Sequence, residues 1–215
     1  MLKMLTACFG FLSAPVAACE LALILAIDVS SSISGGEYRF QVDGLAEALM
    51  QPEVQNALLS DQIALAVVQW SGHNEQELSI SWRRMLSAAE IRNFANRVSN
   101  MERRWDKGQT AIGNAIAFSS EQFDAVRDCK RRVIDISGDG ASNSGLATSG
   151  QRLIAQNAGI EINGLAIDRV GRAITSFYER FVVTRGGFVL TSRGYSDYSR
   201  VMRAKLLREF VKPSS

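Results

Sequence analysis

Apolar residues follow two alternating periods along most of the chain. Continuous apolar runs of strand length, typical of strands buried on both faces of a sheet, fall at 20–27, 63–70, 132–136, 160–167 and 187–191. Between them, apolar residues recur at steps of three and four, which indicates amphipathic helices. These helices are expected at 38–49, 88–98, 111–126, 147–157, 173–183 and 197–210. The alternation predicts an α/β fold of the doubly wound kind, with a mostly parallel sheet covered on both faces.

One further strand has a different pattern. Leu78, Ile80 and Trp82 alternate with serines, which predicts a half-exposed edge strand paired through a hairpin with the strand at 63–70. His73 is expected at the tip of that hairpin, and Trp82 as a packing residue at the far end of the strand.

The first residues have the pattern of an export signal. Lys3 supplies a positive charge, an apolar run follows, and small residues at 15–18 suit cleavage. The run is shorter than the roughly 18 residues that span a bilayer. We therefore expect a signal peptide at 1–18 and a mature domain at 19–215, periplasmic or secreted; the alternative is a retained N-terminal anchor.

Composition and charge argue against several classes of function. With 215 residues, 47% of them apolar and 3 prolines, the chain is of the size of one compact domain. A formal net charge of +2 is too balanced for a protein that mainly binds nucleic acid or an anionic membrane. The single histidine argues against a His-rich zinc site or a Ser-His-Asp catalytic centre.

The cysteines allow two fates. Cys8 lies in the expected signal peptide, which leaves Cys19 and Cys129 as an even pair suited to a disulfide in an oxidising compartment. Residues 16–19 also resemble a lipidation sequence in which Cys19 becomes a lipid-anchored N-terminus. The two fates exclude each other because they use the same sulfur.

Oxygen-bearing side chains gather where the first and fourth buried strands end. Asp28, Ser30 and Ser32 alternate along an extended segment, Asp139 follows the strand at 132–136, and Thr110 begins the preceding helix. In an open α/β sheet, ligands bind beyond the carboxyl ends of the strands. An all-oxygen donor set favours Mg²⁺, Ca²⁺ or Mn²⁺ over zinc or copper. Taken singly, each residue also fits an ordinary turn or helix cap.

This combination resembles the metal-ion-dependent adhesion site of von Willebrand factor type A domains. The shared motif is Asp28-x-Ser30-x-Ser32, then Thr110, then Asp139, and the resemblance covers about residues 21–210. Three further segments are similar to a bacterial exported subgroup of that fold: 37–39, 68–72 and 135–140. The chain departs from many relatives at Ser31 and Gly138, neither of which supplies a required ligand.

The resemblance implies a six-stranded sheet in the order 3-2-1-4-5-6, with strand 3 antiparallel. Strands one and four would then be parallel neighbours. Cys19 and Cys129 precede Asp28 and Asp139 by similar intervals, so the implied order places both cysteines at the opposite end of those strands. Neighbouring strands are about 4.8 Å apart, close to the separation a disulfide needs. The implied fold therefore favours the disulfide over lipidation.

The resemblance also implies how the site works. Hydroxyls of Ser30 and Ser32 would bind the cation directly, with Thr110, Asp28 and Asp139 acting directly or through water. Few anionic oxygens would touch the ion, so an acidic group of a partner protein completes its shell. Trp70 and Trp105 are expected near this point, either as a rim for the partner or as cover for the core.

Two other functions compete with this interpretation. Asp28 at the end of the first strand is similar to the nucleophile of a Mg²⁺-dependent phosphatase, but Ser30 stands where that class carries a second acidic residue. A scaffolding domain without metal-dependent binding is the other alternative. The short basic run of Arg103, Arg104 and Lys107 could steer an acidic partner or form a solvated loop. We expect a binding module, not an enzyme.

Overall fold

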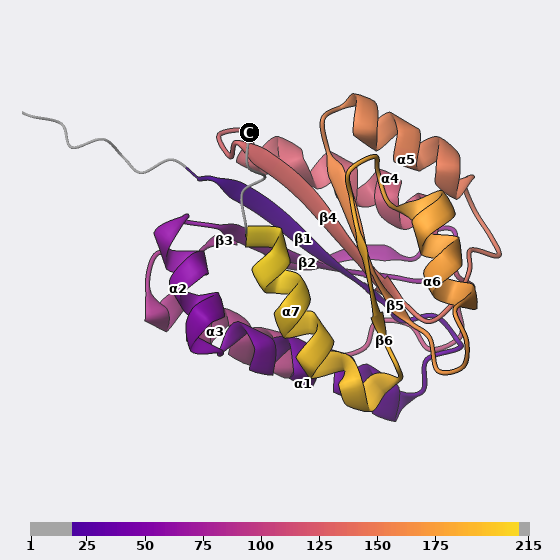
Figure 1. Cartoon of the computed structure of the whole chain (residues 1–215), viewed down its shortest axis with the longest axis horizontal. Helices are drawn as coiled ribbons and strands as arrows, with labels where there is room; N and C mark the ends of the chain where they lie inside the picture. The colour runs from indigo at the N-terminus through magenta and orange to yellow at the C-terminus, as the bar shows by residue number, and fades with distance from the viewer. Residues whose placement is uncertain (1–18, 211–215) are drawn as a thin grey trace, which may run out of the picture.

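The strands form one six-stranded sheet in the order β3-β2-β1-β4-β5-β6 in the computed structural model, which describes residues 19–210 (Figure 1). The strands are β1 (Leu21–Asp28), β2 (Ala64–Trp70), β3 (Gln76–Arg84), β4 (Arg131–Gly138), β5 (Glu161–Ile167) and β6 (Val189–Ser192). β3 is antiparallel to β2, and the other neighbours are parallel. The predicted fold class, strand order and edge strand are confirmed.

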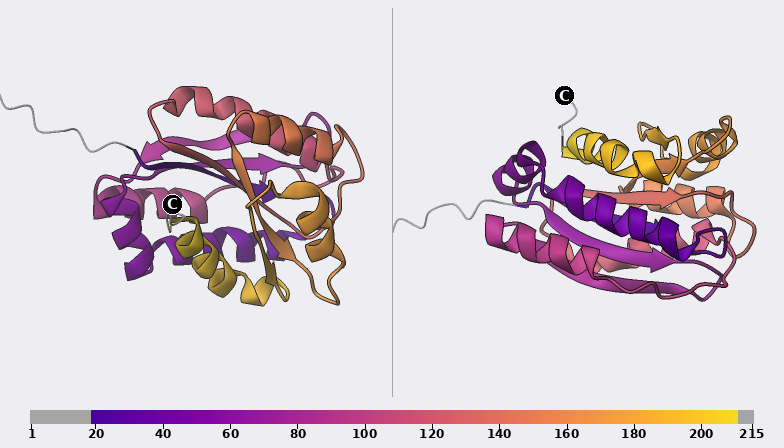
Figure 2. Two further views of the ribbon diagram at one scale, coloured as in Figure 1. Left: turned by 45° about the horizontal axis from the view of Figure 1, so that its top comes forward. Right: turned by 90° about the horizontal axis from the view of Figure 1, so that it is seen from below.

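Helices cover both faces of the sheet (Figures 1 and 2). On one face lie α1 (Gly35–Leu49), α2 (Pro52–Ser60), α3 (Ala88–Ser99) and α7 (Tyr198–Phe210). On the other lie α4 (Ile112–Gln122), η1 (Phe123–Val126), α5 (Thr148–Asn157), α6 (Ala173–Phe177) and η2 (Tyr178–Val182). The short turn η3 (Tyr195–Asp197) leads into α7.

β1 holds the two layers together. Leu21, Leu23, Leu25 and Ile27 belong to the core shared with the α1 layer, whereas the residues between them pack against the α4 layer. Every residue of β1 is buried. The continuous apolar run is the consequence of this two-sided burial, because neither face of a central parallel strand meets water.

Two predicted helices are divided in the structure, and one further helix was not predicted. α1 ends at Leu49, and Pro52 begins the additional helix α2, since proline is well suited to the first turn of a helix. The helix expected at 111–126 changes to a 3₁₀ turn at Phe123, and the helix expected at 173–183 becomes a π-turn at Tyr178. The last strand begins at Val189, because a turn from Thr184 to Gly187 occupies the preceding residues.

A disulfide joins Cys19 and Cys129, whose Cα atoms lie 4.5 Å apart. Both residues are buried at the end of the sheet opposite Asp28. Backbone hydrogen bonds from Lys130 to Cys19 and from Arg131 to Glu20 hold the two segments in parallel register beside it. The disulfide prediction is confirmed.

The expected signal peptide lies outside the described residues. Within residues 19–210, no helix is both long and apolar enough to cross a membrane.

A buried group of charges connects the sheet to the last helix. Lys205 Nζ lies 2.9 Å from Asp135 Oδ2 and 2.6 Å from Glu209 Oε1, and all three side chains are almost fully buried. Burial raises the pKa of Asp135 and of Glu209, and the nearby Lys205 offsets only part of that rise. Burial disfavours the charged form of Lys205 too, but the two carboxylates outweigh this effect and raise its pKa. The lysine thus compensates two carboxylates at the α7–sheet contact.

We predict that Cys129→Ser lowers the free energy of unfolding by several kcal/mol. The disulfide spans a sequence separation of 110 residues, and closing a loop of about 100 residues is worth up to ~4.7 kcal/mol in the chain-entropy model. Urea unfolding of Cys129→Ser, Cys19→Ser and the double variant measures the effect. All three should lose similar stability, and reductant should destabilise only the wild type; equal stability of wild type and double variant would contradict the prediction.

We predict that Lys205→Met costs about 3–5 kcal/mol at neutral pH, because it leaves two buried carboxylates without a cation. Their pKa values in the folded state are already raised, so the folded state binds protons more readily than the unfolded state does. The free energy of unfolding therefore falls as pH rises above the ordinary carboxyl range. The loss of stability caused by Lys205→Met should accordingly become smaller at lower pH. Urea unfolding between about pH 5 and pH 8, where the raised carboxyl pKa values make stability depend on pH, measures the free energy of unfolding of the wild type and the variant. The variant Lys205→Met/Asp135→Asn/Glu209→Gln should lose the pH-dependent part; a pH-independent cost for Lys205→Met would refute the explanation.

Candidate metal centre

The structure brings the five predicted oxygen-bearing residues together at one end of the sheet. Ser30 Oγ lies 3.2 Å from Ser32 Oγ and accepts from Thr110 Oγ1 at 3.4 Å. Ser32 Oγ donates to Asp139 Oδ1 at 2.6 Å, and Asp28 Oδ1 accepts from the backbone N–H of Ser30 at 2.8 Å. Residues from three segments therefore form one continuous cluster. Ser32 is exposed to solvent, so the cluster opens on that side.

Parallel register explains why these segments meet. β1 is hydrogen-bonded to both β2 and β4, so Asp28 lies opposite Trp70 and one residue beyond the pair Ile27–Ser137. The backbone then leaves the sheet, held by a bond from the N–H of Val29 to the carbonyl of Trp70. The strand ends thus fix Asp28 and Asp139 on adjacent strands at the same edge.

Arg103 fixes the loop that carries the serines. One guanidinium nitrogen of Arg103 donates to the carbonyls of Val29 and Ser30, each at 2.9 Å. The N–H of Ser31 donates to the carbonyl of Gly108 at 2.9 Å. Arg104, in contrast, forms an exposed ion pair with Glu77. Within the basic run, Arg103 is therefore the residue that holds the serine loop in position beside the site.

Thr110 is held from the other side by the loop after β4. Asn143 Oδ1 accepts from the Thr110 N–H at 2.9 Å, and the Asn143 N–H donates to the Thr110 carbonyl at 2.9 Å. Ser142 Oγ donates to the same carbonyl at 3.2 Å. The Thr110 backbone is fully engaged, which leaves its side chain to face Ser30.

Asp28 is the least compensated residue of the cluster. It is fully buried, and burial raises its pKa to about 7; hydrogen bonds from Ser30 oppose the rise and the neighbouring Asp139 adds to it. Its Oδ2 atom has no hydrogen-bond partner among the described residues. A buried carboxylate oxygen without a donor is costly unless a cation meets it. The donor chemistry and this unpartnered oxygen therefore fit a divalent cation.

The cluster is rich in hydroxyls and poor in carboxylates. In residues 19–210, no group of three or more His, Cys, Asp or Glu side chains is placed to hold a metal ion. A search for acidic or thiol clusters misses such a site, because three of its five donors are neutral. All-oxygen donors suit Mg²⁺, Ca²⁺ or Mn²⁺.

Three more residues from the second half of the chain surround the cluster. Tyr195 Oη donates to Asp139 Oδ2 at 3.1 Å, and the Arg169 guanidinium lies 4.0 Å from the same oxygen while it pairs with Glu37. Tyr178 is fully buried, and burial together with the nearby Asp28 raises its pKa well above the usual range. These residues were missed because tyrosines and arginines carry no local motif that ties them to a distant loop.

The two tryptophans differ from each other. Trp70 is fully buried in the core beneath α4, so of its two expected roles the structure supports cover of the core and not a rim. Trp105 is only partly buried, against the other core. Trp82 packs on Phe123, with ring centroids 5.5 Å apart, as expected of a packing residue. His73 is exposed in the hairpin turn, as expected, and its ring meets Asn114.

Solved structures similar to this chain share its fold. The proximal thread matrix protein 1 of the mussel byssus, in a form with a zinc-occupied MIDAS motif, matches with a TM-score of 0.67 and 20% identity over 90% of this chain and 48% of that chain. The pilus adhesin SpaC from Lactobacillus rhamnosus GG gives 0.66 and 14% over 88% of this chain and 30% of that one. A von Willebrand factor type A protein from Catenulispora acidiphila gives 0.63 and 16% over 89% and 43%. This chain spans less than half the length of each.

The fold is thus that of a von Willebrand factor type A domain, with the strand order and antiparallel edge described above. The chain belongs to the family described as "Protein of unknown function (DUF1194)", whose model matches residues 18–214. Among curated proteins, none matches the sequence significantly.

We predict that Gly138→Ala disrupts the cluster. A Cβ atom at Gly138 would lie 2.7 Å from Tyr178 Oη and 2.8 Å from Asp28 Oδ2, and both side chains are fully buried. Overpacking of this kind costs about 1–3 kcal/mol, which urea unfolding measures. Gly140→Ala is the matched control, since its Cβ would make only ordinary contacts with Thr110, from 3.6 Å. Equal stability of the two variants would refute the steric explanation.

Proposed function

We propose that this protein binds a divalent cation through Asp28, Ser30, Ser32, Thr110 and Asp139, and that it uses the bound cation to dock an acidic group of a partner protein. The observation that carries the proposal is the buried Asp28 Oδ2, which has no hydrogen-bond partner among the described residues and belongs to a cluster of three hydroxyls. We infer Mg²⁺, Ca²⁺ or Mn²⁺ as the ion. A Mg²⁺ ion held by these residues would supply a Lewis-acidic position for a carboxylate oxygen of the partner.

The chain's own residues give each part of the site a role. Ser30 and Ser32 are neutral donors, so they bind without cancelling the charge of the ion. Asp28 provides buried negative charge from below, and Asp139, held by Tyr195, provides it from the side. Ser32 is exposed, so the side chains leave access for a partner's carboxylate at this point.

The solved structures support this direction of inference. One similar structure is described with a zinc-occupied MIDAS motif and another is a pilus adhesin. This chain covers only 48% and 30% of those two proteins, so their partners are not assigned to it. An exported location, periplasmic or secreted, agrees with the disulfide, which persists in oxidising compartments. We propose residues 19–215 as the mature binding domain.

A phosphatase-like hydrolase is the second class of function. It would need an acid–base group beside Asp28, and the position two residues further on is Ser30, whose hydroxyl faces Ser32 and Thr110. Absence of turnover of a generic phosphomonoester, at a Mg²⁺ concentration that saturates the site, separates the two functions. A scaffolding domain would bind its partner equally well with EDTA present.

We predict that Ser30→Ala/Ser32→Ala abolishes saturable metal binding or weakens it by about tenfold or more, since bound cations lose affinity steeply with each donor removed. Titration calorimetry of the protein with Mg²⁺, Ca²⁺ and Mn²⁺, each with and without glutamate as a carboxylate mimic, measures this. Glutamate should strengthen the apparent affinity for the metal.

The control is Ser79→Ala/Ser81→Ala, an equally spaced pair of serines on the edge strand β3. It should bind metal like the wild type. Unchanged affinity in Ser30→Ala/Ser32→Ala, or silence of the wild type both with and without glutamate, would mean that the oxygen cluster is only a turn.

A further inference from the structure

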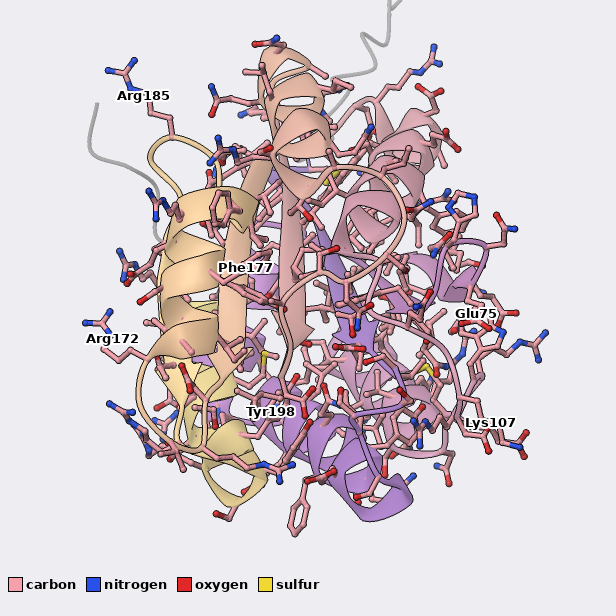
Figure 3. All side chains as sticks on the ribbon, turned by 90° about the vertical axis from the view of Figure 1, so that its right-hand side faces the viewer. Glu75, Lys107, Arg172, Phe177, Arg185 and Tyr198 are labelled. Atoms are coloured by element: carbon pink, nitrogen blue, oxygen red, sulfur yellow. A yellow bond between two sulfur atoms is a disulfide. The ribbon has the colours of Figure 1, made fainter. Side chains whose placement is uncertain are left out.

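An open groove of about 390 Å³, called the cavity below, lies beside the candidate metal centre. Its walls are the loop 142–149 on one side and the rings of Phe177 and Phe181 on the other. Figure 3 views this end of the molecule, with Phe177 of α6 and Arg172, which precedes α6, on one side and Glu75 and Lys107 on the other. None of these walls was part of the motif that the sequence suggested.

The loop wall is continuous with the metal centre. Ser142 and Asn143 line the cavity, and both bond the Thr110 backbone. Leu146, also in this wall, is held by a bond from its N–H to Asn114 Oδ1 at 2.8 Å, yet its side chain stays 41% exposed. The loop also packs so closely on α4 that a Cβ at Gly113 would lie 2.1 Å from the Leu146 carbonyl oxygen. The wall is therefore preformed.

The opposite wall is aromatic and carries a cation. Phe177 and Phe181 lie with ring centroids 5.2 Å apart, and Phe181 remains 37% exposed. The Arg180 guanidinium lies 5.6 Å from the centre of the Phe181 ring. Tyr178, next to Phe177, is buried beneath this wall, and its hydroxyl reaches the space between Gly138 and Asp28. The loop wall thus contacts Thr110 of the metal centre, and Tyr178 beneath the aromatic wall lies near Asp28.

The segment that forms the aromatic wall is strongly basic. From residue 169 to 193 the sequence has five arginines but one acidic residue, Glu179. Arg169 and Arg172 pair with Glu37 and Glu179. In the part of the chain that the structure describes, the other three have no carboxylate within ion-pair distance; they are Arg180, Arg185 and Arg193. Of these three, Arg180 lies against Phe181 of the aromatic wall, whereas Arg185 lies beside Gln156 of α5, near the start of β5. Arg180 can therefore face an acidic ligand at the cavity.

We propose that the cavity is the second half of the docking site and that it holds an aromatic or large aliphatic side chain of the partner. The partner is an acidic protein segment: one carboxylate docks at the metal, the apolar side chain a few residues away enters between Leu146 and Phe181, and further acidic residues face Arg180. The proposal rests on the metal-dependent docking proposed above and names the partner's chemistry. Apolar anchors in a preformed pocket beside a charge contact are typical of tight interfaces.

The test uses fluorescently labelled short peptides with one Asp, a Phe placed one, two or three positions from it, and Glu residues beyond. Matched peptides carry Ala in place of Phe. Anisotropy titrations in saturating Mg²⁺ should show tighter binding of at least one Phe peptide. Phe181→Ser and Leu146→Ser should weaken the binding of that Phe peptide by about tenfold. The affinity of the matched Ala peptide should not change. Arg180→Ala should weaken both peptides and reduce the dependence of binding on salt.

Control variants separate the cavity from general surface effects. Leu153→Ser and Ile154→Ser remove exposed apolar residues of α5 that do not line the cavity; at 53% and 60% they are more exposed than Leu146 and Phe181. Arg92→Ala removes a cation from α3, on the other helical layer. All three should bind like the wild type. Equal binding of Phe and Ala peptides, or equal effects of Phe181→Ser and Leu153→Ser, would overturn the proposal.

The two proposals fail in distinguishable ways. If metal and glutamate bind but Phe gives no advantage, only the cavity assignment is wrong. If the metal titration is silent, metal-dependent docking is wrong. Peptide binding in EDTA that still depends on Phe181 would then retain the cavity as a metal-independent site for acidic, aromatic peptides. If no peptide binds in EDTA either, both proposals are wrong. Self-association that Phe181→Ser abolishes in sedimentation experiments would assign the cavity to a second copy of this chain and overturn the peptide assignment.

Discussion

A carboxylate placed at the end of a fully buried strand is the constraint on which the rest of the site depends. β1 is apolar over its whole length because both of its faces are covered, and Asp28 is its last residue. Burial alone would favour the neutral acid, as the pKa of about 7 indicates. Hydrogen bonds from the backbone N–H and the hydroxyl of Ser30 oppose this effect, and Arg103 anchors the loop that carries Ser30. One oxygen is still left without a donor, so the site is assembled around a charge that the described residues do not fully meet.

The same adjacency of β1 and β4 determines both ends of the molecule. At one end it brings Asp28 beside Gly138 and Asp139, and at the other it brings Cys19 beside Cys129. The disulfide limits relative sliding of the two strands at their start. A register shift of one residue would turn Asp28 toward the α1 layer, because side chains alternate between the faces of a sheet. A covalent bond at the far end of the strands thus contributes to the geometry of the site.

Much of the fold and of the oxygen cluster could be predicted from sequence, because both depend on local patterns. Continuous apolar runs indicated every strand except the alternating edge strand β3, and the polar residues directly after Ile27 and Gly138 indicated the oxygen cluster. The extra helix α2 was missed because it buries only Val54 and Leu58, too few for a visible stripe. For Trp70 the sequence left two roles open, at a rim or over the core, because it ends a strand beside Asp28; its side chain lies in the core on the α4 side. Tyr178, Tyr195 and the aromatic wall had no local signal, since only the chain path brings them to the cluster.

The predominance of hydroxyls at the site follows from the closeness of its two carboxylates. Asp139 already raises the pKa of Asp28 through charge repulsion. A third carboxylate at position 30 or 32 would increase that repulsion in a buried setting and favour protonation of one of the acids. Serine avoids this, because its oxygen donates an electron pair without bringing a charge. In the proposed function, the same choice would leave more of a bound cation's charge unneutralised than an acidic cage would, and so preserve its attraction for an external carboxylate. The stability of the cluster and the proposed binding of an acidic partner therefore both favour serine at positions 30 and 32.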